Sequence, residues 1–278
     1  MVEKEIINRK GARKTQDIPK KVILLLNKGE IETVNLTEWL AINQIELIRN
    51  TFPSIGLSEH IDKLQNNIEQ LKKTSTMSSI KSVGETLYDI CLKRKTLSSV
   101  IDKLSSHKSD TLRCYATYLI SLNSMLNIED KLNASLKLIA DKHFGVREIV
   151  WMALRPEIEK DLEKSISILS NWTNNSDENI RRFTTEVIRP RGVWCKHLES
   201  LKEKPEQALS ILEKLKSDKS KYVQDSVGNW LNDASKTKPK FVIELCKKWK
   251  ENSQTKETEK IIKRALRTIE SKKKGYNK

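Results

Sequence analysis

The chain has 278 residues and a formal net charge of +15, with 52 lysines and arginines against 37 aspartates and glutamates. Its length suffices for one large domain or an elongated array, and its charge favours a polyanionic partner over an acidic small molecule. Four cysteines lie far apart without a CxxC pair, the N-terminus lacks an apolar segment, and no run of about 18 apolar residues occurs. These features argue against a disulfide framework, a zinc site and a membrane span, so we expect a cytoplasmic protein with no membrane partner.

The first 80 residues are predicted to form a basic arm and a helical cap. Eight glycines and six prolines are few for this length, and apolar residues recur at helical spacing, so the chain is predicted to be all-α. After the arm NRKGARK, apolar periodicity predicts helices over Lys20–Asn27, Leu36–Arg49 and Ile61–Lys72. The segment KKTSTMSSIKS is expected to join this cap to the rest of the chain.

Residues 81–270 show an internal repeat of about 34 residues. Val146-Arg147 in VREIVWMALRP recurs 34 positions later as Ile180-Arg181 in IRRFTTEVIRP, and Leu112-Arg113 lies 34 positions earlier. Asp141 and Asp218 each lie five residues before the valine that opens the next helix. An acidic turn followed by an apolar–basic pair resembles the HEAT-repeat pattern, in which helical hairpins stack because none buries its apolar face alone. The sequence predicts a right-handed α-solenoid of HEAT-like helical hairpins; the alternative is an irregular helical bundle.

Later segments extend this pattern. Leu162–Leu169 and Gln207–Leu215 are predicted to be the first helices of two hairpins. Tyr222 and Ile261 are predicted to begin two further second helices of hairpins. The basic residues 271–278 are predicted to form a tail.

The stretch NIRRFTTEVIRPRGVW, from Asn179 to Trp194, places one carboxylate among four arginines. On a helical wheel Arg182, Glu186 and Arg189 share the face opposite the apolar residues, at i, i+4 and i+7. A solvated ion pair between neighbouring turns is one explanation. A functional face is the other.

The preceding repeat favours the functional explanation. On the same wheel the segment VREIVWMALRP leaves Arg147, Glu148, Trp151 and Arg155 opposite the apolar stripe. A tryptophan beside two arginines suits a surface that binds sugar and phosphate and offers an aromatic plane. The alternative is that Trp151 packs against an adjacent repeat.

The second helices of HEAT-type hairpins line the concave face, so these side chains are expected to converge on one groove. Its basic residues are Arg147, Arg155, Arg182, Arg189, Arg191, Lys196, Arg264 and Arg267, which suit a duplex backbone. The carboxylates Glu148, Glu186 and Asp233 repel phosphate, so their presence in such a groove indicates a purpose such as stabilising a developing cation. GxGxxG, Walker A and HExxH motifs do not occur, and the four histidines lack metal-ligand spacing, so neither a cofactor nor a metal is expected.

Together, RRFTTEVIRPRGVW, YVQDSVGNWLNDASK and IIKRALRTI resemble the DNA alkylation repair family, the HEAT-repeat DNA glycosylases of the AlkC/AlkD type. The resemblance covers roughly Val83–Ile269 and is closest to the AlkC branch. The chain ends at Lys278 without the immunoglobulin-like domain that some AlkC proteins carry, so we expect no DNA contact from such a domain.

Residue roles follow from matching positions. Arg182, Glu186, Arg189, Arg191 and Trp194 match the family block R-R-x-x-x-E-x-x-R-P-R-x-x-W. The other predicted site residues are Asp233 in the L-N-D block, a C-terminal arginine at Arg264 or Arg267, and Glu148, which matches less closely. The predicted catalytic residues are therefore Glu186, Asp233 and Glu148.

The resemblance implies hydrolysis of the N-glycosidic bond of N-alkylated bases in duplex DNA, without extruding the base into a pocket. An alkylated, cationic base leaves readily, and preorganised carboxylates can stabilise the oxocarbenium ion that forms on the sugar. A monomer that associates with the nucleoid when it binds DNA is expected. The alternatives are a non-catalytic DNA-binding solenoid and, third, a protein–protein scaffold.

Overall fold

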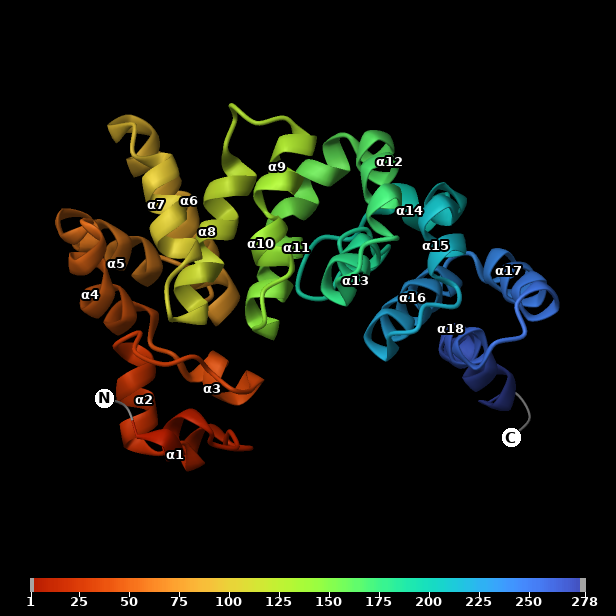
Figure 1. The fold of residues 1–278 in the computed structure, drawn as a ribbon, viewed down its shortest axis with the longest axis horizontal. Helices are drawn as coiled ribbons and strands as arrows, with labels where there is room; N and C mark the ends of the chain where they lie inside the picture. Colours follow the sequence, from red (N-terminus) through yellow and green to blue (C-terminus); the bar gives the residue numbers. More distant parts are fainter. Residues whose placement is uncertain (1–2, 276–278) are drawn as a thin grey trace. The chain divides into compact units, whose positions relative to one another are not determined.

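The computed structural model describes residues 3–275, and side chains through residue 271. Within this range every regular element is a helix, as predicted for an all-α solenoid of helical hairpins (Figure 1). By its internal contacts the chain divides into two units: unit 1 runs through Asn127 and includes Asn133–Ala153, and unit 2 holds Ile128–Leu132 and the residues from Leu154 onward.

Unit 1 contains the N-terminal elements and the first hairpins. Its helices are α1 (Lys4–Ile7), α2 (Lys20–Asn27), α3 (Leu36–Ala41), α4 (Gln44–Ile55), α5 (Ile61–Glu69), α6 (Thr76–Arg94), α7 (Leu97–Ser105), α8 (Asp110–Leu122) and α10 (Leu136–Ile139), with 3-10 turns η1 (Thr15–Asp17) and η2 (Ser58–His60). Helices α6, α7 and α8 pack on one another. Gly84 lets α6 approach α8 closely, because a β-carbon there would lie 2.4 Å from the Cβ of Tyr118.

Unit 2 contains the later hairpins. Its helices are α12 (Leu162–Trp172), α13 (Glu178–Glu186), α14 (Glu199–Glu203), α15 (Leu209–Leu215), α16 (Lys221–Ser235), α17 (Pro239–Asn252) and α18 (Lys256–Gly275), with the 3-10 turn η3 (Pro205–Ala208). Helices α9 (Ile128–Ala134) and α11 (Phe144–Lys160) cross from one unit to the other. In unit 2, α16 packs between α13 and α18, and its Trp230 is fully buried.

The predicted cap helices are confirmed with one exception. Helix α2 has the predicted bounds, and α5 begins at Ile61 as predicted but ends at Glu69, before the predicted Lys72. The predicted helix Leu36–Arg49 is instead two helices, because the side chain of Asn43 accepts hydrogen bonds from the backbone N–H groups of Ile45 and Glu46 and so begins α4. At the other end, α18 continues to Gly275, so the first part of the predicted tail is helical and residues 276–278 lie outside the described range.

An arginine near the start of the helix stabilises the preceding turn in three of the repeats. Arg113 donates to two carbonyls of the turn before α8 and binds both carboxylate oxygens of Asp141 at 2.7 and 3.1 Å. Arg181 repeats this arrangement with the turn before α13 and with Asp218, at 2.7 and 3.0 Å. Arg147 donates to two carbonyls of the turn before α11, at 2.6 and 2.9 Å. The 34-residue pattern in the sequence therefore marks a turn whose backbone carbonyls need a hydrogen-bond donor.

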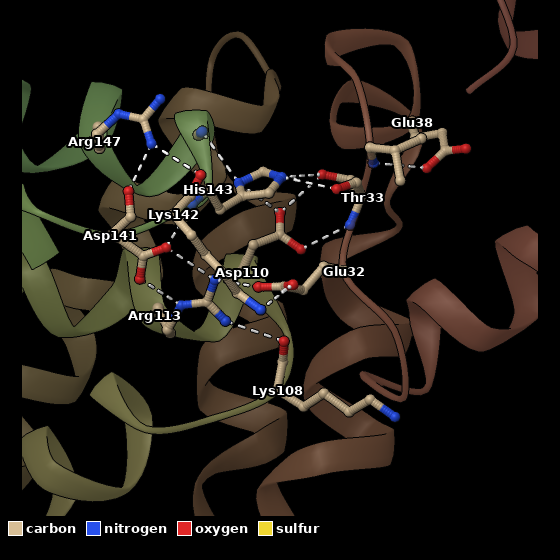
Figure 2. A network of polar contacts seen from close by, with 12 residues as sticks. Glu32, Thr33, Glu38, Lys108, Asp110, Arg113, Asp141, Lys142, His143 and Arg147 are labelled. Atoms are coloured by element: carbon tan, nitrogen blue, oxygen red, sulfur yellow. Dashed lines mark hydrogen bonds and ion pairs between the residues drawn. The ribbon is translucent and has the colours of Figure 1, made fainter. Parts of the chain in front are cut away.

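The segment 31–38 is joined to this bracing network (Figure 2). Glu32 accepts from Arg113 at 2.5 Å and from Lys142 at 2.8 Å, and the N–H and Oγ1–H of Thr33 donate to the buried Asp110, both at 3.0 Å. These bonds make the cap part of unit 1, whereas the sequence analysis placed a domain boundary near residue 80.

Glu32 should make unit 1 sensitive to acid. Burial opposes the ionisation of Glu32, but Lys142 and Arg113 outweigh that effect and lower its pKa. A lowered pKa in the folded state stabilises the protein above the unfolded pKa of about 4.3, and this contribution is lost as the pH falls through the folded value. We expect Glu32→Gln to reduce the free energy of unfolding by about 1 kcal/mol at pH 7, and by progressively less below pH 4.

Urea denaturation of both proteins across this pH range checks the expectation. Glu30→Gln, which removes an exposed carboxylate nearby, is the matched control and should change little. A Glu32→Gln effect of the same size at every pH would contradict an ionised Glu32 as the stabilising group.

Within residues 3–275, none of the helices combines the length and the apolar character that crossing a membrane requires.

Candidate active site

Two carboxylates from neighbouring helices of unit 2 meet on one arginine. Glu186 ends α13 and Asp233 lies near the end of α16, and each is 3% exposed. The guanidinium of Arg189 contacts Glu186 through Nη1 at 3.3 Å and Asp233 through Nη2 at 2.6 Å and Nε at 3.0 Å. The structure therefore brings together Glu186, Arg189 and Asp233, which the sequence analysis assigned to one site although Arg189 and Asp233 lie 44 residues apart.

Further groups fix the Glu186 carboxylate. The hydroxyl of Ser226 donates to Oε1 at 2.7 Å, and Arg182 Nη2 lies 3.6 Å from the same oxygen. The guanidinium of Arg182 also stacks over the ring of Tyr222, with 4.3 Å from Cζ to the ring centroid. Glu186 thus takes part in a buried network and is not half of a solvated ion pair.

Asp233 has a second cationic partner besides Arg189. Lys236, one turn further along the chain from Asp233 and 39% exposed at its side chain, donates to Oδ1 at 2.9 Å. Burial opposes the charge of Arg189, but Glu186 and Asp233 outweigh it and raise the Arg189 pKa. Arginine is always protonated in water, so the group at the centre of the site is a permanent cation held between two acids.

Arg155 organises the chain that follows α13. Its Nη1 donates to the carbonyl of Val187 at 2.9 Å, its Nε to that of Lys196 at 2.9 Å, and its Nη2 to that of Arg189. These include carbonyls at the C-terminal end of α13, which otherwise lack partners and carry partial negative charge. Burial is the main reason that the Arg155 pKa lies below its usual value. Arg155 therefore positions both Arg189 and the loop 190–198.

That loop presents an exposed aromatic residue. Trp194 is 58% exposed and has φ 59°, a left-handed conformation that few non-glycine residues adopt. Gly192 in the same loop has no room for a side chain, because a β-carbon there would lie 2.2 Å from the sulfur of Cys195 and 3.2 Å from the guanidinium carbon of Arg155. The half-buried Arg191 has an Nε without a hydrogen-bond partner.

The C-terminal arginines line a separate cationic hollow of about 420 Å³ between α16 and α18. Arg264 pairs with Asp225 at 2.6 Å, and Arg267 donates to Asn232 at 3.0 Å. The remaining cations of the lining are Lys221, Lys260 and Lys263.

Three predicted surface residues are placed differently from the expectation. Trp151 is 2% exposed and its ring N–H donates to Glu148 at 3.0 Å, so the expected exposed aromatic plane is wrong and the side chain is buried. Arg155 is 3% exposed and faces backbone carbonyls, and Arg147 braces a turn. Burial within the array leaves Trp151 and Arg155 almost no surface on which to hold phosphate. Glu148 is half-buried in unit 1.

The sequence analysis missed Ser226, Tyr222 and Lys236. A signal existed for two of them, because Ser226 and Tyr222 lie seven and eleven residues before Asp233 and so share its face of α16. Among the described residues, no group of three or more histidine, cysteine, aspartate or glutamate side chains is arranged to hold a metal ion.

Comparisons with known proteins show what this part of the chain resembles. Residues 148–269, which hold most of the site, match the family model described as DNA alkylation repair enzyme. An uncharacterized protein of Bacillus subtilis (strain 168), YhaZ, is 30% identical over 227 residues, which are 81% of this chain and 60% of that protein.

Two solved structures share the fold. The Pseudomonas fluorescens alkylpurine DNA glycosylase AlkC, bound to DNA containing an abasic site analog, aligns with a TM-score of 0.64 and 23% identity over 81% of this chain and 61% of its own. AlkD2 from Streptococcus mutans aligns with a TM-score of 0.59 and 24% identity over 75% of this chain and 96% of its own. The chain thus spans about 60% of the length of YhaZ and of AlkC. Residues 148–269, which include Glu186 and Asp233, thus match the family of DNA alkylation repair enzymes, and the helical-repeat fold matches that of AlkC and AlkD2.

Proposed function

We propose that the protein is a DNA glycosylase of base excision repair that hydrolyses the N-glycosidic bond of N-alkylated, cationic bases in duplex DNA. The observation that supports this most is the pair of buried carboxylates, Glu186 and Asp233, joined by Arg189 within the matched family segment. We further propose that it acts as a monomer without a cofactor, in the cytoplasm or on the nucleoid, and without extruding the base.

The proposed reaction requires mainly negative charge near the sugar. An alkylated base already carries positive charge and leaves readily, and positive charge then develops on the deoxyribose. Glu186 and Asp233 are each 3% exposed, where low dielectric strengthens their field, and their partners fix both in place before the reaction. This burial favours electrostatic stabilisation of the oxocarbenium ion over direct removal of a proton from water. Glu148, oriented by Trp151, remains a third candidate.

Cations other than Arg189 and Arg155 are proposed to bind the DNA phosphates. Arg189 and Arg155 are bonded within the protein, so phosphate contacts are proposed for other cations, and Trp194 offers its exposed ring to the sugar or the lesion. The proposed phosphate ligands are Arg182, Arg191, Lys196, Arg264 and Arg267, together with the lysines of the α16–α18 hollow. AlkC, whose structure contains DNA, has the same fold.

The lysines of the hollow provide a test of this interface. We expect Lys260→Met with Lys263→Met to weaken binding of damaged and undamaged duplex alike, and to reduce the slope of log K against log salt by roughly 0.9 for each phosphate that the variant no longer neutralises. Fluorescence anisotropy at several salt concentrations measures both quantities. Lys164→Met, an exposed lysine on α12, is the matched control and should leave the slope unchanged. An unchanged slope in the double variant would exclude the hollow from the interface.

The proposed reaction is tested by incubating the wild-type protein with methylated duplex and scoring abasic sites. Abasic sites that form in proportion to the protein support the enzyme. Tight binding with no abasic sites would support the alternative, a non-catalytic DNA-binding protein with the same fold.

A further inference from the structure

A second cavity, of about 600 Å³, opens in unit 1, and its lining includes none of the residues proposed above for catalysis. It is lined by residues of the N-terminal arm, by the segment 31–34 and by the turns before α8 and α11. Figure 2 shows Glu32, Arg113 and Asp141 from the lining of the cavity. Its volume lies within the range of roughly 300–1,000 Å³ that is usual for small-ligand pockets.

The floor of this cavity is rigid and electrically neutral. Arg113 binds Asp141 through two nitrogens and Glu32 through a third contact, and Lys142 binds Glu32 at 2.8 Å. Two cations therefore balance two acids. Burial opposes the charge of Arg113, but Asp141 and Glu32 outweigh it and raise its pKa, so the network stays charged and fixed.

Two lysines on the cavity wall remain uncompensated. Arg9 is balanced by Glu38, which it contacts at 2.6 and 2.9 Å. Among the described residues no carboxylate lies within ion-pair distance of Lys108 or Lys137; Lys137 donates only to the hydroxyl oxygen of Ser106, at 2.9 Å. That hydroxyl keeps its own hydrogen for another acceptor.

A neutral donor stands beside these lysines. His107 lines the cavity, and its Nδ1 accepts the backbone N–H of Ser109 at 3.0 Å, so the neutral ring carries its proton on Nε2. Burial and, second, the charge of Arg113 lower the His107 pKa, which keeps the ring neutral at pH 7.

The cavity lining also includes apolar side chains that are exposed to solvent. Ile7 is 55% exposed and Val34 40% exposed, although both line the cavity. Exposed aliphatic side chains next to uncompensated lysines suit a ligand that joins an anion to an apolar or planar group.

We propose that this cavity binds a phosphomonoester that carries a planar group, such as a nucleoside 5′-monophosphate, either free or as the 5′ end of a DNA strand. A phosphomonoester has a charge of about −1.5 to −2 at pH 7, which matches the two uncompensated lysines better than the single charge of an internal phosphodiester. Lys108, Lys137, Ser106 and His107 donate to its oxygens, and Ile7 and Val34 contact the planar group. The proposal does not depend on glycosylase activity.

Calorimetric titration of the full chain with 2′-deoxyadenosine 5′-monophosphate tests the proposal. We expect saturable binding that the double variant Lys108→Met, Lys137→Met weakens at least about tenfold, because two charge-assisted hydrogen bonds are removed. Lys63→Met, an exposed lysine on α5, is the matched control and should bind as the wild type does. Deoxyadenosine, which lacks the phosphate, and inorganic phosphate, which lacks the planar group, should each bind at least about tenfold more weakly.

Oligonucleotides distinguish the two sources of the phosphomonoester. A preference for 5′-phosphorylated over 5′-hydroxyl DNA that disappears in the double variant assigns the site to a DNA end, and binding of the monophosphate without such a preference assigns it to a small molecule. Undetectable monophosphate binding at millimolar concentration, equal binding by the double variant, or equal binding of deoxyadenosine would each overturn the proposal.

Discussion

Glu186→Gln is expected to slow excision of a methylated base by roughly ten- to a thousand-fold, the scale of one preorganised electrostatic contact. The substitution keeps the shape of the side chain and can keep the hydrogen bond from Ser226, but it removes the charge. That charge matters most in the transition state, where the sugar is cationic. Affinity for DNA should stay the same or rise slightly, because a group that repels phosphate is removed.

Single-turnover excision and DNA affinity, measured on the same preparations, check this prediction. Asp233→Asn should behave similarly, and the two losses need not add because both acids bind Arg189. Glu163→Gln removes an acid near the start of α12, outside the site, and is the matched control. Excision by Glu186→Gln at the wild-type rate would reduce Glu186 to a partner of the arginines around it.

The second large effect is expected at Arg189. Arg189→Met keeps much of the volume but removes the cation that both buried carboxylates bind. Breaking a buried ion pair by removing one partner costs about 3–5 kcal/mol of the free energy of unfolding, so we expect a loss on that scale together with slower excision. Denaturant unfolding measures the loss directly.

Arg189→Lys separates charge from geometry at the same position. Lysine restores the cation but not the planar group that reaches both acids, so it should recover part of the stability and less of the activity. If Arg189→Met unfolds at the wild-type denaturant concentration, the two carboxylates are not coupled through this residue.

The sequence predicted the repeats well because they rest on local chemistry. The apolar–arginine pairs mark turns whose carbonyls need a donor, and Arg113 and Arg181 occupy them with the same geometry. The break at Asn43 was missed because apolar periodicity continues across it, although an asparagine before Gln44–Ile55 is a usual helix start.

The site was predictable only in part. Glu186 and Arg189 lie three residues apart, so the helical wheel places them together. The bond from Arg189 to Asp233 joins residues 44 positions apart, and their proximity was suggested only by the expected convergence of second helices on one groove and by the family resemblance. The wheel failed for α11 because it assumes one solvated face. Trp151 and Arg155 lie on the presumed polar side, yet both are buried.

The most direct test of the proposed function is single-turnover excision by the wild-type protein on a duplex that contains one N3-methylated adenine. The duplex is first shown to bind at the salt concentration used. We predict abasic sites in proportion to the bound duplex, at a rate that Glu186→Gln reduces. A duplex that remains intact while bound at saturation would contradict the assignment of Glu186 and Asp233 to catalysis.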